Sequence, residues 1–119
     1  MQAPTPKALV VDDDAALRML MRVNLELDGF AVSEAETLDE ARESLDNGHP
    51  DVVLLDVHVG REDSGALLGE LRARGVPVAI VTGSADLADY RDIADAVIEK
   101  PFEPSALVEL ARRLARVAG

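Results

Sequence analysis

Asp51-Val52-Val53-Leu54-Leu55-Asp56 decides the fold, because here four apolar residues in a row stand between two aspartates. A short apolar run that is β-branched at Val52 and Val53 is typical of a strand buried on both faces of a parallel sheet. Asp56 comes where the run stops, which places its carboxylate at the carboxyl end of that strand. In open α/β sheets this edge is where ligands bind. An aspartate that merely begins a loop is the alternative, and the rest of the chain decides between the two.

Short apolar runs and helical patterns alternate along the whole chain. Four further apolar runs predict strands at residues 7–11, 30–35, 76–82 and 96–99. A helical pattern follows each strand, although the one in residues 83–95 is short and compatible with a mobile segment. Five successive β-α units predict a doubly wound, five-stranded parallel sheet of the flavodoxin-like α/β class, with helices on both faces.

Local signals mark where the other helices begin and end. Asp13 or Asp14 is placed to cap the first helix, and Gly29 to end it. The second is predicted from the capping box that starts at Thr37 to about Asn47, with Gly48 as its stop, and the third ends at Gly75. The last helix begins at Pro104, since proline suits a first helical position.

Length and composition fit one small folded domain. The chain has 119 residues, of which 48% are hydrophobic, and this suffices for one core and argues against disorder. Residues 1–6 are expected to form a flexible tail and residues 7–119 the domain, with no second domain after it. The sequence has no cysteine, which excludes disulfides, zinc–thiolate sites and thiol nucleophiles.

Charge narrows the classes of partner. Twelve basic and 23 acidic residues give a formal charge of −11, which opposes binding to nucleic acid phosphates. The three aromatic residues are too few for a base-stacking platform. A metal cation or a basic partner surface is the better expectation. We find no signal sequence and no apolar run near the ~18 residues that span a membrane, so we expect a cytoplasmic protein that does not bind membranes.

Polar residues follow four of the predicted strands where each strand ends. Asp12 and Asp13 follow the first strand, Asp56 ends the third, Thr82 ends the fourth and Lys100 follows the fifth. Three carboxylates at one edge repel one another unless a cation is present, and hard oxygen ligands suit Mg²⁺. A hydroxyl and an ammonium suit phosphoryl oxygens, and a carboxylate beside Mg²⁺ can attack phosphorus. Each of these residues alone could be a helix cap or a solvated side chain. Core packing hardly explains why such residues stand at the ends of four predicted strands.

From about residue 7 to residue 115 the sequence resembles the receiver domain of two-component response regulators, the CheY-like family. The resemblance rests on four motifs: Val10-Val11-Asp12-Asp13-Asp14, Asp51-Val52-Val53-Leu54-Leu55-Asp56, Pro77-Val78-Ala79-Ile80-Val81-Thr82 and Lys100-Pro101-Phe102. It implies a phosphoprotein of a two-component phosphorelay, which accepts a phosphoryl group from a histidine kinase in a Mg²⁺-dependent reaction. It also implies a protein that is not an enzyme beyond its own phosphotransfer and autodephosphorylation.

The resemblance assigns roles to individual residues. Asp56 would be the phosphoacceptor. Asp12 and Asp13 would hold Mg²⁺ together with Asp56 and the backbone carbonyl of His58. Thr82 and Lys100 would contact the phosphoryl oxygens. The Lys-Pro bond of the family is commonly cis, and we expect the same at Lys100-Pro101.

The chain departs from the family pattern at several positions. After the phosphoacceptor the family usually reads Pro-Gly and then Asp-Gly, whereas this chain has Gly60-Arg61 and then Asp63-Ser64-Gly65. The family usually has Tyr or Phe three residues before the lysine, and here that position is Val97. The Thr82-Gly83 pair and the short segment after it resemble a subgroup of stand-alone receivers that work with HWE-type histidine kinases.

Our first hypothesis is therefore a stand-alone receiver, monomeric or weakly dimeric, that signals by protein contact or acts as a phosphate sink for its kinase. A receiver-like binding module that works without phosphorylation is the second hypothesis. A Mg²⁺-dependent phosphatase with an aspartyl intermediate is the third, and the lack of a cap domain or second acid argues against it. His58 either influences water attack on the phosphoaspartate or is a solvated loop residue. Tyr90 either replaces the aromatic residue that the family usually has at the position of Val97, which acts as a rotating switch there, or packs the fourth helix against the domain.

Overall fold

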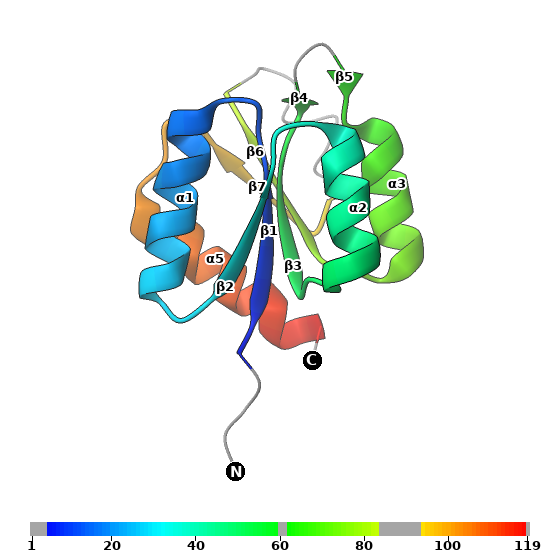
Figure 1. Cartoon of the computed structure of the whole chain (residues 1–119). Coiled ribbons are helices and arrows are strands. Elements are labelled where there is room, and N and C mark those ends of the chain that lie inside the picture. The colour runs from blue at the N-terminus through cyan, green and yellow to red at the C-terminus, as the bar shows by residue number, and fades with distance from the viewer. Residues whose placement is uncertain (1–4, 60–61, 84–93, 119) are drawn as a thin grey trace.

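The computed structural model describes residues 5–59, 62–83 and 94–118, and every structural statement below refers to these residues. Five strands form one sheet in the order β2-β1-β3-β6-β7, and every neighbouring pair is parallel (Figure 1). The strands are β1 (Lys7–Val11), β2 (Ala31–Ala35), β3 (Val52–Asp56), β6 (Val78–Thr82) and β7 (Ala96–Glu99). The predicted doubly wound sheet is confirmed.

Four helices cover the two faces of the sheet. They are α1 (Ala15–Leu27), α2 (Leu38–Gly48), α3 (Gly65–Arg74) and α5 (Pro104–Ala118). Helices α1 and α5 lie on one face and α2 and α3 on the other (Figure 1). The predicted short helix in residues 83–95, with Tyr90, lies mostly outside the described residues. Among the helices of the described chain, none has the length and apolarity to cross a bilayer.

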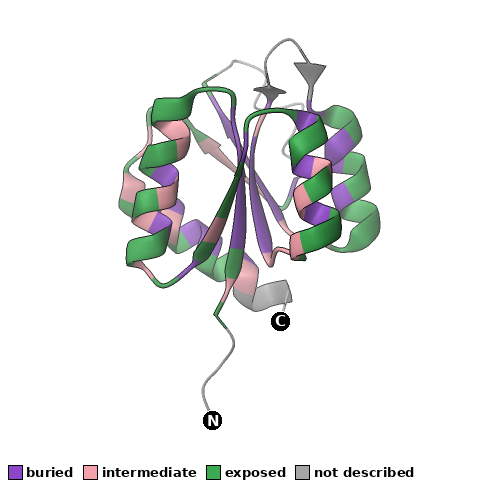
Figure 2. Ribbon diagram, viewed as in Figure 1, coloured by how far each residue is buried: buried purple, intermediate pink, exposed green. Residues whose placement is uncertain are grey.

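Strand β3 is the centre of the core, and Figure 2 shows the inner strands in the colour of buried residues. Val53 and Leu55 pack in the cluster beneath α2 and α3, whereas Val52 and Leu54 pack in the cluster beneath α1 and α5. All four side chains are fully buried. Because both faces of the strand are covered, its sequence is apolar without alternation, as predicted.

The predicted helix signals are mostly confirmed. The Asp14 carboxylate caps α1 by accepting from the backbone N–H groups of Ala16 and Leu17, at 3.0 and 3.3 Å. The Thr37 hydroxyl caps α2 by accepting from the N–H of Glu40 at 3.1 Å. Gly75, with φ of 72°, ends α3.

The predicted stop of α2 at Gly48 is wrong by one residue. Gly48 is the last helical residue, and His49 takes the left-handed conformation, with φ of 47°. Pro50 follows, and a proline keeps the residue before it out of the right-handed helical region. The helix therefore extends through Gly48, and His49 separates its end from the proline.

A small hairpin follows the central strand. Strand β4 (His58–Val59) pairs antiparallel with β5 (Glu62–Asp63), and α3 begins two residues later. The sequence patterns did not predict this hairpin. It keeps residues 57 and 64 close together beyond the end of β3, since the N–H of Ser64 donates to the carbonyl of Val57 at 3.0 Å.

Leu54→Ala is expected to lower the free energy of unfolding by about 2–5 kcal/mol, because the side chain is fully buried between sheet and helices. Leu27→Ala is the matched control. This leucine is 82% exposed on α1, and its replacement should change stability by no more than about 0.5 kcal/mol. Urea unfolding followed by circular dichroism measures both. Equal losses in the two variants would contradict the described core.

Candidate functional site

The sheet changes direction between β1 and β3. From β1 the chain winds to β2 on one side, and from β3 it winds through β6 to β7 on the other. The helices after β1 and β3 therefore leave on opposite faces, and a crevice opens at the carboxyl ends of these two strands. Asp12 and Asp13 directly follow β1, and Asp56 is the last residue of β3.

Three carboxylates meet in this crevice. One oxygen each of Asp12, Asp13 and Asp56 lies within 4.8 Å of the other two. Asp12 is buried, and the Asp56 side chain is 14% exposed. Hard oxygen donors this close together fit Mg²⁺, which takes oxygen ligands in octahedral geometry and keeps several waters. The structure thus brings together the three side chains that the sequence analysis assigned to a metal.

Lys100 reaches the same crevice from the segment after β7. Its Nζ lies 3.5 Å from Oδ2 of Asp12 and 3.4 Å from Oδ1 of Asp56. Its backbone N–H donates to the carbonyl of Thr82 at 2.8 Å. The Lys100-Pro101 peptide is cis, as expected.

Thr82 is buried at the carboxyl end of β6, the strand beside β3. Its predecessor Val81 is the register partner of Asp56. The structure therefore places the predicted hydroxyl on the neighbouring strand, one residue beyond the level of Asp56. The His58 backbone lies in β4, and its part in metal binding stays a prediction.

The crevice holds more negative than positive charge. Burial raises the pKa of Asp56 above the ordinary aspartate value, and the neighbouring charge of Asp12 raises it further, against the opposing effect of Lys100. Burial likewise raises the pKa of Asp12, although the N–H of Asp14 and the Lys100 ammonium oppose the shift. One ammonium does not compensate this group of carboxylates, and a divalent cation would.

Two residues that the sequence analysis missed hold the backbone of the site. The Arg18 guanidinium, on α1, donates to the carbonyl of Asp12 at 2.7 Å and to the Glu34 carboxylate at 3.2 Å. The Ser64 hydroxyl donates to the carbonyl of Asp56 at 2.6 Å. No sequence motif marks either contact, because each acceptor is a backbone carbonyl and any residue type has one.

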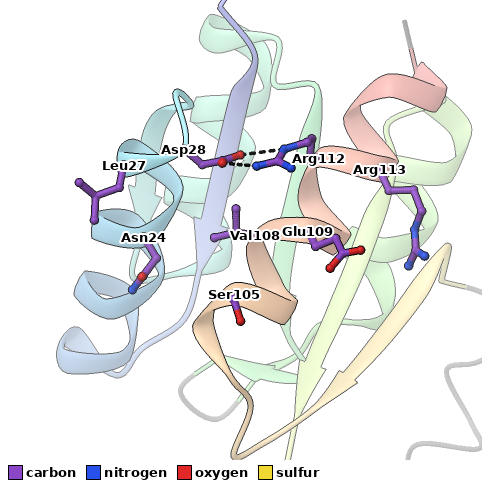
Figure 3. A pocket seen from close by; sticks show the side chains of 8 residues that line it. All are labelled: Asn24, Leu27, Asp28, Ser105, Val108, Glu109, Arg112 and Arg113. Atoms are coloured by element: carbon purple, nitrogen blue, oxygen red, sulfur yellow. Dashed lines mark hydrogen bonds and ion pairs between the residues drawn. The ribbon is translucent and has the colours of Figure 1, made fainter.

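A separate groove of about 560 Å³ lies between α1 and α5 (Figure 3). Asn24 and Leu27 line it from one helix and Val108 from the other, and the ion pair of Arg112 with Asp28 spans it. None of the residues of the acidic crevice lines this groove. The chemistry predicted from the sequence therefore belongs to the sheet edge and not to the groove.

Comparison with known proteins agrees with this arrangement. The family model described as "response regulator receiver domain" matches residues 8–112. The chain is 32% identical to the probable transcriptional regulator ycf27 of Cyanophora paradoxa, over 98% of this chain and 51% of the relative. It is 34% identical to the response regulator MprA of Mycobacterium sp. (strain KMS), over 92% of this chain and 50% of the relative. The chain thus spans about half the length of these curated relatives.

Among solved structures, the chain is similar to a CheY-like response regulator receiver domain protein from Methanospirillum hungatei JF-1. The TM-score is 0.88 at 28% identity, and the match covers 97% of both chains. The similarity therefore extends over the whole sheet and its helices.

Asp56→Asn is expected to stabilise the metal-free protein at neutral pH. A carboxyl whose pKa is raised by folding costs stability in full above its folded pKa and nothing below its unfolded pKa. The amide removes this cost, so the gain should shrink as the pH falls toward the ordinary aspartate pKa. Each kcal/mol relieved raises Tm by about 4 °C in a domain of this size.

Thermal unfolding in the presence of a chelator, measured across the pH range, tests this expectation. Asp39→Asn is the control, because that carboxylate is 95% exposed on α2. A Tm of Asp56→Asn at or below that of the parent at neutral pH would show that the carboxylates are not in electrostatic conflict.

Proposed function

The chain belongs to the response regulator receiver domain family of two-component signalling, and we propose that it accepts a phosphoryl group from a histidine kinase on Asp56. The observation that carries the proposal is the crevice at the sheet edge. There Asp12, Asp13 and Asp56 converge, and Lys100 contacts two of the three carboxylates. Receiver domains generally bind Mg²⁺ and interact with histidine kinases, and the three carboxylates fit the first of these two properties.

The transfer is a displacement at phosphorus. A carboxylate oxygen of Asp56 forms the new O–P bond while the P–N bond of the kinase phosphohistidine breaks, and the bonding pair returns to the histidine nitrogen, which takes a proton from water. A bound Mg²⁺ would offset charge on the phosphoryl oxygens, and Asp12 and Asp13 would hold it together with Asp56.

Lys100 links the reaction to the rest of the fold. Before transfer its ammonium donates to the carboxylates of both Asp12 and Asp56. When Asp56 becomes an acyl phosphate, the charge moves outward to the phosphoryl oxygens, and the ammonium is placed to follow it. The Thr82 hydroxyl, on the neighbouring strand, donates to the same group. Movement of these two residues would favour one of two conformations of the surface around β7 and α5.

The finer assignments are part of the same proposal. Val97 is partly buried against the core beneath α2 and α3, where the family usually has an aromatic residue. Together with the Thr82-Gly83 pair, it supports the stand-alone subgroup with an HWE-type kinase. Such a receiver signals by protein contact or acts as a phosphate sink for its kinase. It catalyses only its own phosphotransfer and dephosphorylation.

Incubation with acetyl phosphate and Mg²⁺ is expected to add one phosphoryl group to the parent chain and none to Asp56→Asn, since the amide is a poor nucleophile. Intact-protein mass spectrometry measures the adduct. Asp39→Asn should be labelled like the parent. Labelling of Asp56→Asn at another residue would count against the assignment. Partner binding that survives Asp56→Ala would favour a module that works without phosphorylation.

Mg²⁺ is expected to raise the Tm of the parent, because an ion that binds only the folded state stabilises it by about 2.7 kcal/mol at 100 times its Kd. Asp13→Asn should reduce this rise, since it removes one of the three converging carboxylates. Differential scanning fluorimetry at constant ionic strength measures the effect. An equal rise in the two proteins would remove Asp13 from the metal site.

A further inference from the structure

Ser64 stands at a helix N-cap, but its side chain bonds to the main chain of the neighbouring site and not to its own helix. It stands at the N-cap of α3, where a serine hydroxyl ordinarily accepts from a backbone N–H of the first helical turn. Here the side chain makes no such bond. The hydroxyl instead donates to the carbonyl of Asp56 at 2.6 Å, and the backbone N–H of Ser64 donates to the next carbonyl, that of Val57, at 3.0 Å.

One residue thus holds two successive peptide groups. The carbonyls of Asp56 and Val57 belong to the peptides on either side of the Val57 Cα, and both accept from Ser64. The surroundings are dry, because Ser64 and Val57 are both buried. A buried carbonyl that loses its donor is penalised, so this pair of bonds strongly restricts the backbone where β3 ends.

We propose that Ser64 is a positioning residue of the acidic site, which fixes the backbone just beyond Asp56 and so sets the geometry in which the site binds Mg²⁺. The inference rests on the proposed function, because it takes the carboxylates of Asp12, Asp13 and Asp56 as metal ligands. The two peptide groups that Ser64 holds connect Asp56 to His58, and the carbonyl of His58 is the expected backbone ligand of the metal. Ser64 touches no ligand itself and acts through the main chain.

The hydroxyl, rather than the backbone of Ser64, carries the specific contribution. The bond to the Val57 carbonyl needs only an N–H and persists with any residue but proline. The bond to the Asp56 carbonyl needs the side chain. In the family pattern this position is the glycine of Asp-Gly, which has no hydroxyl to donate. In this chain the position is Ser64, which has one. Ser64 has φ of −77°, so its conformation does not require glycine.

The test compares Ser64→Ala with Thr37→Ala in the full chain. Each change removes a hydroxyl from a helix N-cap position, but Thr37 bonds only to the first turn of α2. Isothermal titration with MgCl₂ gives the Kd of the ion, and thermal unfolding in a chelator gives the stability without metal. Ser64→Ala should weaken Mg²⁺ binding by about tenfold or more, as is usual when an outer-shell partner of a metal site is lost. Thr37→Ala should bind Mg²⁺ like the parent.

Ser64→Gly is the second variant, because glycine is tolerated at an N-cap and also lacks the hydroxyl. It should show the same weakened Mg²⁺ binding, and it decides the matter if Ser64→Ala does not fold. A parental Kd in the folded Ser64 variants, or an equal change in Thr37→Ala, would overturn the proposal, as would a parent that binds no Mg²⁺. A parent that binds Mg²⁺ but accepts no phosphoryl group would contradict the proposed function alone, and the Kd comparison would still decide the role of Ser64.

Discussion

Repulsion among carboxylates at the end of a dry sheet is the constraint on which the site depends. Asp12 and Asp56 are carried there by adjacent parallel strands that the core holds in place, so the backbones of the two residues are kept side by side. Lys100 offsets part of the charge and leaves the rest for a cation. The fold thus spends some of its stability on keeping an electrostatic conflict in place, which is how binding sites are commonly built.

The residues that support this site hold its main chain and leave its carboxylates available. Arg18 donates to the carbonyl of Asp12, and Ser64 donates to the carbonyl of Asp56. A guanidinium directed at the carboxylates would compete with an incoming cation. Instead the charge of Arg18 is paired with the Glu34 carboxylate, which accepts from the guanidinium at 3.2 Å. Support through the backbone therefore gives rigidity without neutralising the site.

The sequence predicted those features that depend on regular repetition or on a fixed chemical role. The five strands were recognisable because burial on both faces demands uninterrupted apolar runs, of which Val52 to Leu55 is the clearest. The candidate site followed from the residues at which those runs end. The hairpin of β4 and β5 escaped prediction, because two-residue strands have no period to detect. The bond of Ser64 escaped because a serine before a helix reads as an ordinary cap, and only the tertiary structure shows that its hydroxyl turns to β3.

The pairing of the first helix with the last has a consequence for how the chain acquires its structure. One face of the sheet is covered by α1 and α5, and Asp28 and Arg112, which join them, are 84 residues apart in sequence. Val10 and Leu54 are translated before α5, so their face of the sheet lacks the cover of that helix until α5 has left the ribosome. Such non-local closure slows folding and leaves apolar surface exposed on the nascent chain. The acidic crevice at the edge of that sheet therefore becomes rigid only after α5 has been translated.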